Sequence, residues 1–131
     1  MVRQKTGLRF VVHDLDAASV QAAVGHGAEA AAGVAALAKT SDVLFVSLPS
    51  GAVLEGLARG ADGLLAHMKH GAIFVDLGTS SVKLTRTLAA EFAARGVRYL
   101  DAPVARTRQA AEAGTLSIMV GGDAADRKSV V

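Results

Sequence analysis

Four short stretches of the sequence carry side chains suited to binding a small ligand, and each follows an apolar run. They are Asp14, Leu48–Ser50, Asp76–Ser80 and Asp101–Thr107. The Asp14 carboxylate could accept hydrogen bonds from the ribose hydroxyls of a dinucleotide, and it would repel the 2′-phosphate that distinguishes NADP from NAD. On the pattern alone, a solvated acid or a helix cap explains Asp14 equally well.

Hydroxyl and guanidinium groups mark two further candidates. Thr79, Ser80 and Ser81 open a helical pattern, where hydroxyls and free backbone N–H groups suit a phosphate or a carboxamide. Helix capping is the commoner role of such residues. Arg106 and Arg108 offer the planar donors that bind a carboxylate, phosphate or sulfonate with two hydrogen bonds, although two surface arginines are the more frequent arrangement.

The elements that must position these residues follow from the spacing of apolar side chains. Short β-branched runs predict strands, and apolar residues three or four apart predict helices. The expected strands are 8–12, 28–31, 43–47, 73–76, 97–101 and 116–120. The expected helices are 17–24, 33–39, one that begins after Ser50, 81–95 and 107–112. This alternation predicts a mostly parallel sheet with ligands beyond the carboxyl ends of its strands.

The composition excludes several classes of function. The chain has 131 residues, enough for one domain, with a formal net charge of +2 and no cysteine. Lys and Arg are scattered, so nucleic-acid or membrane-surface binding gains no support. Disulfides and thiolate metal sites are excluded, and His67 and His70, which have a metal-like spacing, have no carboxylate or cysteine beside them. We therefore expect a cytoplasmic domain without a metal.

Taken together, these segments resemble the β-hydroxyacid dehydrogenase family, typified by 3-hydroxyisobutyrate dehydrogenase. The resemblance rests on Asp14, Ser47–Pro49, Asp76–Thr79, Asp101–Val104 and Gly114–Gly122. It implies that Asp14 holds the ribose of NAD. It also implies that Leu48, Pro49 and Thr79 line the cofactor, and that the loop starting at Asp101 leads into the segment that binds the acid group of the substrate.

The sequence departs from that family in three places. A strand and a G-x-G-x-x-G loop should precede Asp14, and the family's Ser-Gly-Gly is replaced by Ala105-Arg106-Thr107. The replacement resembles the sulfolactaldehyde reductase branch, which implies that Arg106 and Thr107 face the sulfonate of the substrate. The family's helical second domain, with its catalytic Lys, is expected to be absent, so no residue of this chain is assigned a catalytic role.

These expectations define a Rossmann-like α/β fold whose doubly wound sheet lacks its first strand and its Gly-rich loop. Residues 1–131 would be a partial dinucleotide-binding domain. Because the first strand is central in such sheets, either the strand at 8–13 pairs directly with that at 43–47 or the sheet stays split. Unpaired edges favour self-association. We expect weak binding of NAD, in preference to NADP, and no turnover by these residues alone.

The resemblance implies a piece of an NAD-dependent oxidoreductase for a small β-hydroxyacid or its semialdehyde. The substrate types are 3-hydroxyisobutyrate, tartronate semialdehyde and sulfolactaldehyde. Two other classes stay open. A receiver-like signalling domain would use Asp14 and Asp16 as an acidic pair and Asp76 as phosphoacceptor, although the late Lys128 follows no strand. A structural remnant would bind no ligand.

Overall fold

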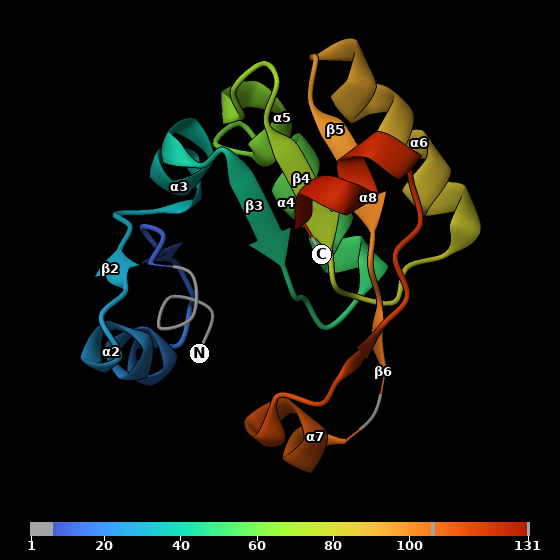
Figure 1. Ribbon diagram of the computed structural model, residues 1–131. Coiled ribbons are helices and arrows are strands. Elements are labelled where there is room, and N and C mark those ends of the chain that lie inside the picture. Colours follow the sequence, from blue (N-terminus) through green and yellow to red (C-terminus); the bar gives the residue numbers. More distant parts are fainter. Residues whose placement is uncertain (1–6, 106, 131) are drawn as a thin grey trace.

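The largest sheet has three parallel strands. The computed structural model describes residues 7–105 and 107–130, the last three of these by their backbone only. The sheet has the order β3 (Val43–Val46), β4 (Ile73–Asp76) and β5 (Arg98–Asp101) (Figure 1). In this register Val46 lies beside Asp76 and Asp76 beside Asp101, so the three strands end at one edge. Strands β3 and β4 were predicted to within a residue.

A second, separate sheet is formed by the N-terminal part of the chain. Here β1 (Val11–Val12) pairs in parallel with β2 (Glu29–Ala30), and α2 (Ala17–Gly25) connects them. Figure 1 shows this unit standing apart from the three-stranded sheet, on the side of β3. Among the described residues no strand lies between β1 and β3, so the split sheet is the arrangement that forms. The strand predicted at 8–12 is shorter because its partner offers only two paired residues.

One face of the three-stranded sheet is covered by helices α3 to α6. Their bounds are α3 Val34–Thr40, α4 Gly51–Arg59, α5 Leu64–His67 and α6 Val82–Ala94. Leu88 and Phe92, which lie four residues apart on one face of α6, are fully buried. The Phe92 ring stacks on Phe74 with centroids 4.7 Å apart, and Tyr99 packs against both rings. This aromatic cluster fixes α6 on β4 and β5.

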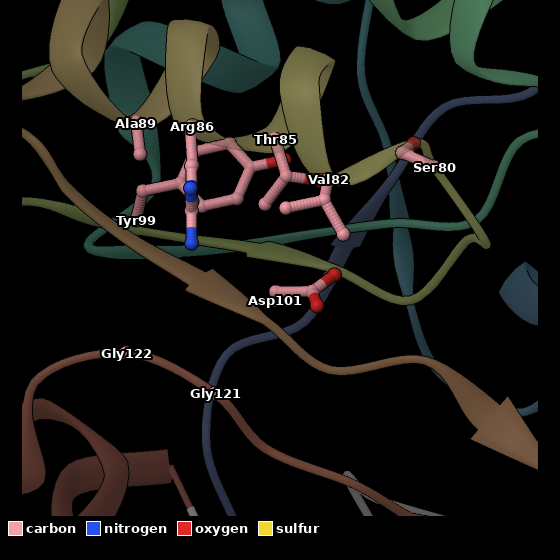
Figure 2. A pocket seen from close by; sticks show the side chains of 9 residues that line it. All are labelled: Ser80, Val82, Thr85, Arg86, Ala89, Tyr99, Asp101, Gly121 and Gly122. Atoms are coloured by element: carbon pink, nitrogen blue, oxygen red, sulfur yellow. The ribbon is translucent and has the colours of Figure 1, made fainter.

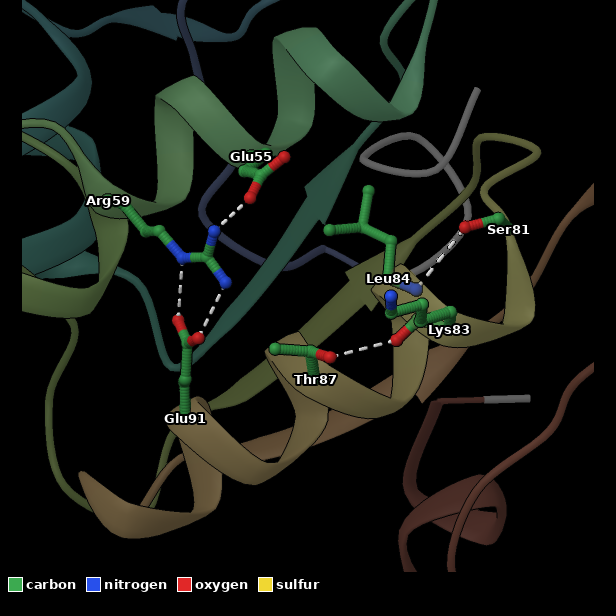
Figure 3. Close-up of polar contacts among 7 residues, drawn as sticks. All are labelled: Glu55, Arg59, Ser81, Lys83, Leu84, Thr87 and Glu91. Atoms are coloured by element: carbon green, nitrogen blue, oxygen red, sulfur yellow. Dashed lines mark hydrogen bonds and ion pairs between the residues drawn. The ribbon is translucent and has the colours of Figure 1, made fainter.

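Polar contacts set where α4 and α6 begin and how they face each other. The Ser50 hydroxyl accepts the N–H of Val53, as expected for a helix cap. The Ser81 hydroxyl accepts the N–H of Leu84 in the same way (Figure 3). Arg59 of α4 donates to Glu91 of α6 over 2.6 Å and also pairs with Glu55 (Figure 3). These ion pairs are exposed, so they contribute little to stability and mainly align the two helices.

The opposite face carries α8 (Ala124–Val130), which contacts β5, and a smaller apolar cluster (Figure 1). Ile73, Val75 and Leu100 form that cluster with Ala102. The sheet therefore has helices on both faces, as expected for a doubly wound fold. A short antiparallel arm follows β5 and projects from the sheet (Figure 1). It comprises β6 (Val104–Ala105), α7 (Arg108–Ala113) and β7 (Ser117–Ile118).

Two kinds of feature are absent from the described part of the chain. None of its helices is long and apolar enough to cross a membrane. The described residues also contain no cluster of three or more His, Asp or Glu side chains that could hold a metal ion.

Candidate functional site

Two loops meet at the carboxyl edge of the three-stranded sheet. The backbone N–H of Leu77 donates to the carbonyl of Val46 over 2.8 Å, which joins the end of β4 to the end of β3. A methyl group added at Gly78 would lie 3.5 Å from the carbonyl oxygen of Leu48. Leu48 and Pro49 thus lie in the first loop and Thr79 in the second, where the sequence predicted neighbouring residues. Pro49 and Thr79 are exposed, and Leu48 is half-buried.

Asp76 is the polar centre of this edge. Its side chain is buried, with 2% of the residue exposed. One carboxylate oxygen accepts the N–H of Gly78 (2.9 Å), and the other accepts the hydroxyls of Ser80 and Tyr99 (3.2 Å each). The sequence placed Asp76 in one of the four candidate stretches, and the one specific role considered for its side chain was that of a phosphoacceptor. The spacing of Asp76 and Gly78, which fits an Asx turn, is the signal that could have revealed its role.

A cavity of about 450 Å³ opens beside Asp76, between α6 and the end of β5. Figure 2 shows Arg86 and Thr85 reaching into it from α6, opposite Asp101 and the backbone of Gly121. Its lining residues are Ser80, Val82, Thr85, Arg86, Ala89, Tyr99, Asp101, Gly121 and Gly122. The cavity adjoins the carboxyl edge of the sheet at Asp101, where a site was predicted, whereas no pattern in the sequence pointed to Arg86.

Beside the cavity, burial and the neighbouring carboxylates of Asp76 and Asp101 change the pKa values of two side chains. Burial, with a smaller effect of the Asp76 charge, raises the pKa of Asp101 above its ordinary value. The same two causes raise the pKa of Tyr99 well above the ordinary value for a phenol. Tyr99 therefore stays a hydrogen-bond donor throughout the neutral range.

Asp14 lies on the separate two-stranded unit. It is exposed just after β1, and one of its oxygens accepts the N–H of Asp16 over 2.8 Å. Asp16 in turn caps the N-terminus of α2 by accepting the N–H groups of Ala18 and Ser19. Among the described residues no hydrogen bond or ion pair joins Asp14 to the loops after β3 and β4. Its role toward a ribose stays a prediction.

The predicted substrate residues lie in the arm. Arg106 falls outside the described residues. Thr107 caps the N-terminus of α7, where its hydroxyl accepts the N–H of Ala110 over 3.4 Å. Arg108 pairs with Glu112 on an exposed surface, which is the arrangement that sequence reasoning gave as the more frequent one. The contacts of Thr107 and Arg108 are local, so a role for Arg106 and Thr107 toward a substrate stays a prediction.

A parallel, doubly wound sheet with its loops gathered at the carboxyl edge is typical of dinucleotide-binding domains. The sequence profile of the NAD binding domain of 6-phosphogluconate dehydrogenase matches residues 2–131, and the chain belongs to that family.

Known relatives confirm the resemblance to β-hydroxyacid dehydrogenases. The 2-(hydroxymethyl)glutarate dehydrogenase of Eubacterium barkeri is 39% identical over 121 residues, which are 92% of this chain and 40% of that protein. The 3-sulfolactaldehyde reductase of Escherichia coli is 32% identical over 118 residues, 90% of this chain and 40% of that protein. The chain thus spans about 40% of the length of these relatives.

Solved structures agree with this assignment. The 3-hydroxyisobutyrate dehydrogenase of Mycobacterium tuberculosis superposes with a TM-score of 0.81 at 30% identity, covering 92% of this chain and 40% of that one. Psf3 in complex with NADP⁺ and 2-OPP superposes with a TM-score of 0.90 at 29% identity, covering 98% of this chain and 45% of that one. Because Psf3 is bound to NADP⁺, family membership leaves the choice between NAD and NADP open.

These findings argue against the receiver-like signalling domain that the sequence left open. A phosphoacceptor has to be accessible to a phosphate donor, whereas Asp76 is buried and its oxygens already accept three hydrogen bonds. Asp16, the second acid of the expected pair, caps a helix.

Proposed function

We propose that this chain is the dinucleotide-binding part of an oxidoreductase that acts on a small β-hydroxyacid or the matching semialdehyde. The observation that carries the proposal is the contact between the loops after β3 and β4, at the carboxyl edge of a parallel sheet. Leu48, Pro49 and Thr79 line the dinucleotide at that edge, and Asp14 accepts hydrogen bonds from its ribose. Residues 1–131 are assigned to the dinucleotide-binding domain.

The described residues fit a dinucleotide in part. Exposed hydroxyl, carboxylate and backbone groups are present for its ribose and carboxamide ends. The described residues contain no Gly-rich turn between a strand and a following helix, the feature that ordinarily holds the pyrophosphate. Weak binding is therefore expected. A bound nicotinamide would supply the hydride-transfer chemistry, and this chain's residues would bind and orient it.

We further propose a preference for NAD over NADP. The negative charge of Asp14 repels a 2′-phosphate, and the next residue is Leu15 rather than an arginine that would offset that repulsion. In a thermal-shift titration of the 131-residue chain, NAD should raise the melting temperature at millimolar concentration, and NADP should do so less. At ten times the Kd, the expected stabilisation is about 1.4 kcal/mol.

The variant Asp14→Asn tests the assigned residue. Asparagine keeps an acceptor for the N–H of Asp16 but loses the charge, so NAD should bind more weakly and the disadvantage of NADP should shrink. Asp62→Asn, which changes an exposed carboxylate outside the proposed binding residues, serves as the control. Equal shifts of the melting temperature with NAD and NADP in the wild-type chain would contradict the assignment. An unchanged ratio of the NAD shift to the NADP shift in Asp14→Asn would contradict it as well.

The anionic end of the substrate is proposed to bind Arg106 and Thr107. Arginine binds carboxylate and sulfonate alike, so the ligand class is a small organic anion. Addition of 3-hydroxyisobutyrate or a short hydroxysulfonate should shift the amide resonances of residues 105–108 in NMR spectra, and Arg106→Gln should remove the shift. Shifts that persist in Arg106→Gln would place the anion elsewhere.

Two broader expectations stay predictions. The chain has no cysteine and a formal net charge of +2, which fits a cytoplasmic protein without a nucleic-acid partner. Fractionation of the producing cells would test the location, and a shift assay with duplex DNA would test the absence of nucleic-acid binding.

A further inference from the structure

We infer that Asp76 is a positioning residue that shapes the loop after β4, so that Thr79 faces the dinucleotide. The inference rests on the proposed dinucleotide binding. Asp76 holds the backbone of Gly78 and the side chain of Ser80, the two residues that flank Thr79. Tyr99 holds the same carboxylate from the neighbouring strand.

Thr79 is exposed between Gly78 and Ser80, the two residues that Asp76 holds in place. The N–H of Gly78 donates to Oδ1 of Asp76 over 2.9 Å, and the hydroxyl of Ser80 donates to Oδ2 over 3.2 Å. Gly78 and Ser80 are half-buried, whereas Thr79 is exposed. No hydrogen bond within the described part of the chain uses the Thr79 hydroxyl. That hydroxyl is therefore available to a ligand, and its position follows from the two contacts beside it.

Tyr99 connects this loop to the hydrophobic core. Its ring packs against Phe74 and Phe92, with centroids 5.1 and 5.7 Å away, and its hydroxyl donates to Oδ2 of Asp76 over 3.2 Å. The core thus fixes the phenol, which adds a third hydrogen bond to the carboxylate and helps to offset the cost of its burial. Asp76 itself is the last residue of β4, so the strand sets the position from which its carboxylate holds the loop.

The chemistry of the three donors requires a carboxylate at this position. One N–H and two hydroxyl groups converge on Asp76, and an ionised carboxylate is the side chain that accepts on both oxygens at once. No Lys or Arg among the described residues forms an ion pair with Asp76, so neutral donors offset the cost of burying its charge. A methyl group at Gly78 would lie 3.1 Å from Oδ1, which explains why glycine suits this turn.

Ser80 and Tyr99 provide a matched pair of variants. Ser80→Ala and Tyr99→Phe each remove one hydrogen bond of 3.2 Å to the same oxygen, but only the first frees the loop. Asp76→Asn keeps the shape of the side chain and replaces one acceptor by an amide donor. We expect Asp76→Asn and Ser80→Ala to weaken NAD binding by about tenfold, and Tyr99→Phe to lower the melting temperature while changing the Kd by less than about threefold.

A double variant separates positioning from direct contact. If Ser80 acts through Asp76, the double variant with Asp76→Asn and Ser80→Ala should have the same affinity for NAD as the single variant that binds NAD more weakly. If Ser80 contacts the dinucleotide independently, the two losses multiply. The Kd values are measured by calorimetry well below the melting temperature of the least stable variant, so that unfolding does not contribute.

A measurement without dinucleotide keeps the inference separate from the proposed function. Backbone order parameters at residues 78–80 should fall in Asp76→Asn and Ser80→Ala but not in Tyr99→Phe. If the wild-type chain binds no NAD, the proposed function fails, and the role of Asp76 toward a dinucleotide fails with it. If NAD binds and Tyr99→Phe loses as much affinity as Ser80→Ala, or Asp76→Asn loses none, the inference alone is overturned.

Discussion

Asp101 and Asp76 occupy paired positions at the ends of adjacent strands, and their proximity affects how stability depends on pH. Burial and the Asp76 charge raise the pKa of Asp101 in the folded protein. The folded state therefore binds the Asp101 proton more tightly than the unfolded state does. As pH rises from the unfolded value, about 3.9, through the raised folded value, stability is lost, and at neutral pH the ionised Asp101 is unfavourable.

We therefore predict that Asp101→Asn raises the free energy of unfolding at pH 7. The neutral amide has a similar shape and avoids the cost of burying a charge beside Asp76. Urea denaturation followed by circular dichroism, repeated from pH 7 down to pH 3, should show the gain shrinking as the wild-type carboxyl becomes protonated. A gain of equal size at both ends of this range would show that the charge is not its cause.

At the scale of elements, α8 is attached to the sheet through one arginine. The Arg98 guanidinium donates to Asp126 of α8 over 2.8 Å and to the carbonyl of Gly71 over 2.7 Å. The Asp126 side chain is 12% exposed, so loss of its partner leaves a nearly buried carboxylate without compensation. This pair is much less accessible to water than the other arginine pair near the C-terminal end, Arg108 with Glu112.

Arg98→Met is expected to lower the free energy of unfolding by about 1–3 kcal/mol. Arg108→Met, which breaks an exposed pair, should change it by less than about 0.5 kcal/mol. Both are measured by urea denaturation, and amide hydrogen exchange should be faster in α8 of Arg98→Met only. Replacing Asp126 by Leu in the Arg98→Met background should recover part of the loss. Equal effects of the two arginine variants would argue against the proposed attachment of α8.

At the scale of the whole molecule, the split between the two sheets leaves β3 as an edge. No described strand pairs with its outer side, and Val43 and Phe45, which alternate with buried residues along β3, expose apolar side chains on one face of this edge strand. An edge of unpaired N–H and C=O groups with exposed apolar side chains is suited to pairing with a second strand. We propose that the 131-residue chain self-associates through this edge.

Phe45→Lys should reduce that self-association, because a charged side chain at an edge strand opposes pairing. Val53→Lys is the matched control, since Val53 lies on α4 and has the same exposed fraction as Phe45, 46%. Sedimentation velocity over a wide range of protein concentration measures the effect. A similar loss of association in both variants would indicate general repulsion between chains, and a monomer at all concentrations would refute the proposal.

Local chemistry determined much of the fold. Apolar spacing predicted β3, β4 and α6 to within one or two residues, and short polar side chains marked the caps Ser50 and Ser81. These features depend on residues a few positions apart, so the sequence displays them directly. The short elements α5, β6 and α8 escaped prediction because two to seven residues offer too little periodicity.

The site was predictable in outline. The resemblance placed Leu48, Pro49 and Thr79 in neighbouring loops, and a parallel sheet brings such loops together at one edge. The position of Asp14 relative to them did not follow, because it depends on how the two sheets are arranged rather than on any local pattern.

The sequence by itself determined the family, the order of the central elements and the residue types available at the carboxyl edge. Only the tertiary structure decided that β1 and β2 form their own sheet and that Asp76 gathers three donors. The reason is that Tyr99 reaches Asp76 from a position 23 residues further along the chain. Such a contact exists only after two strands pair in register and a helix covers them, and no pattern of nearby residues encodes it.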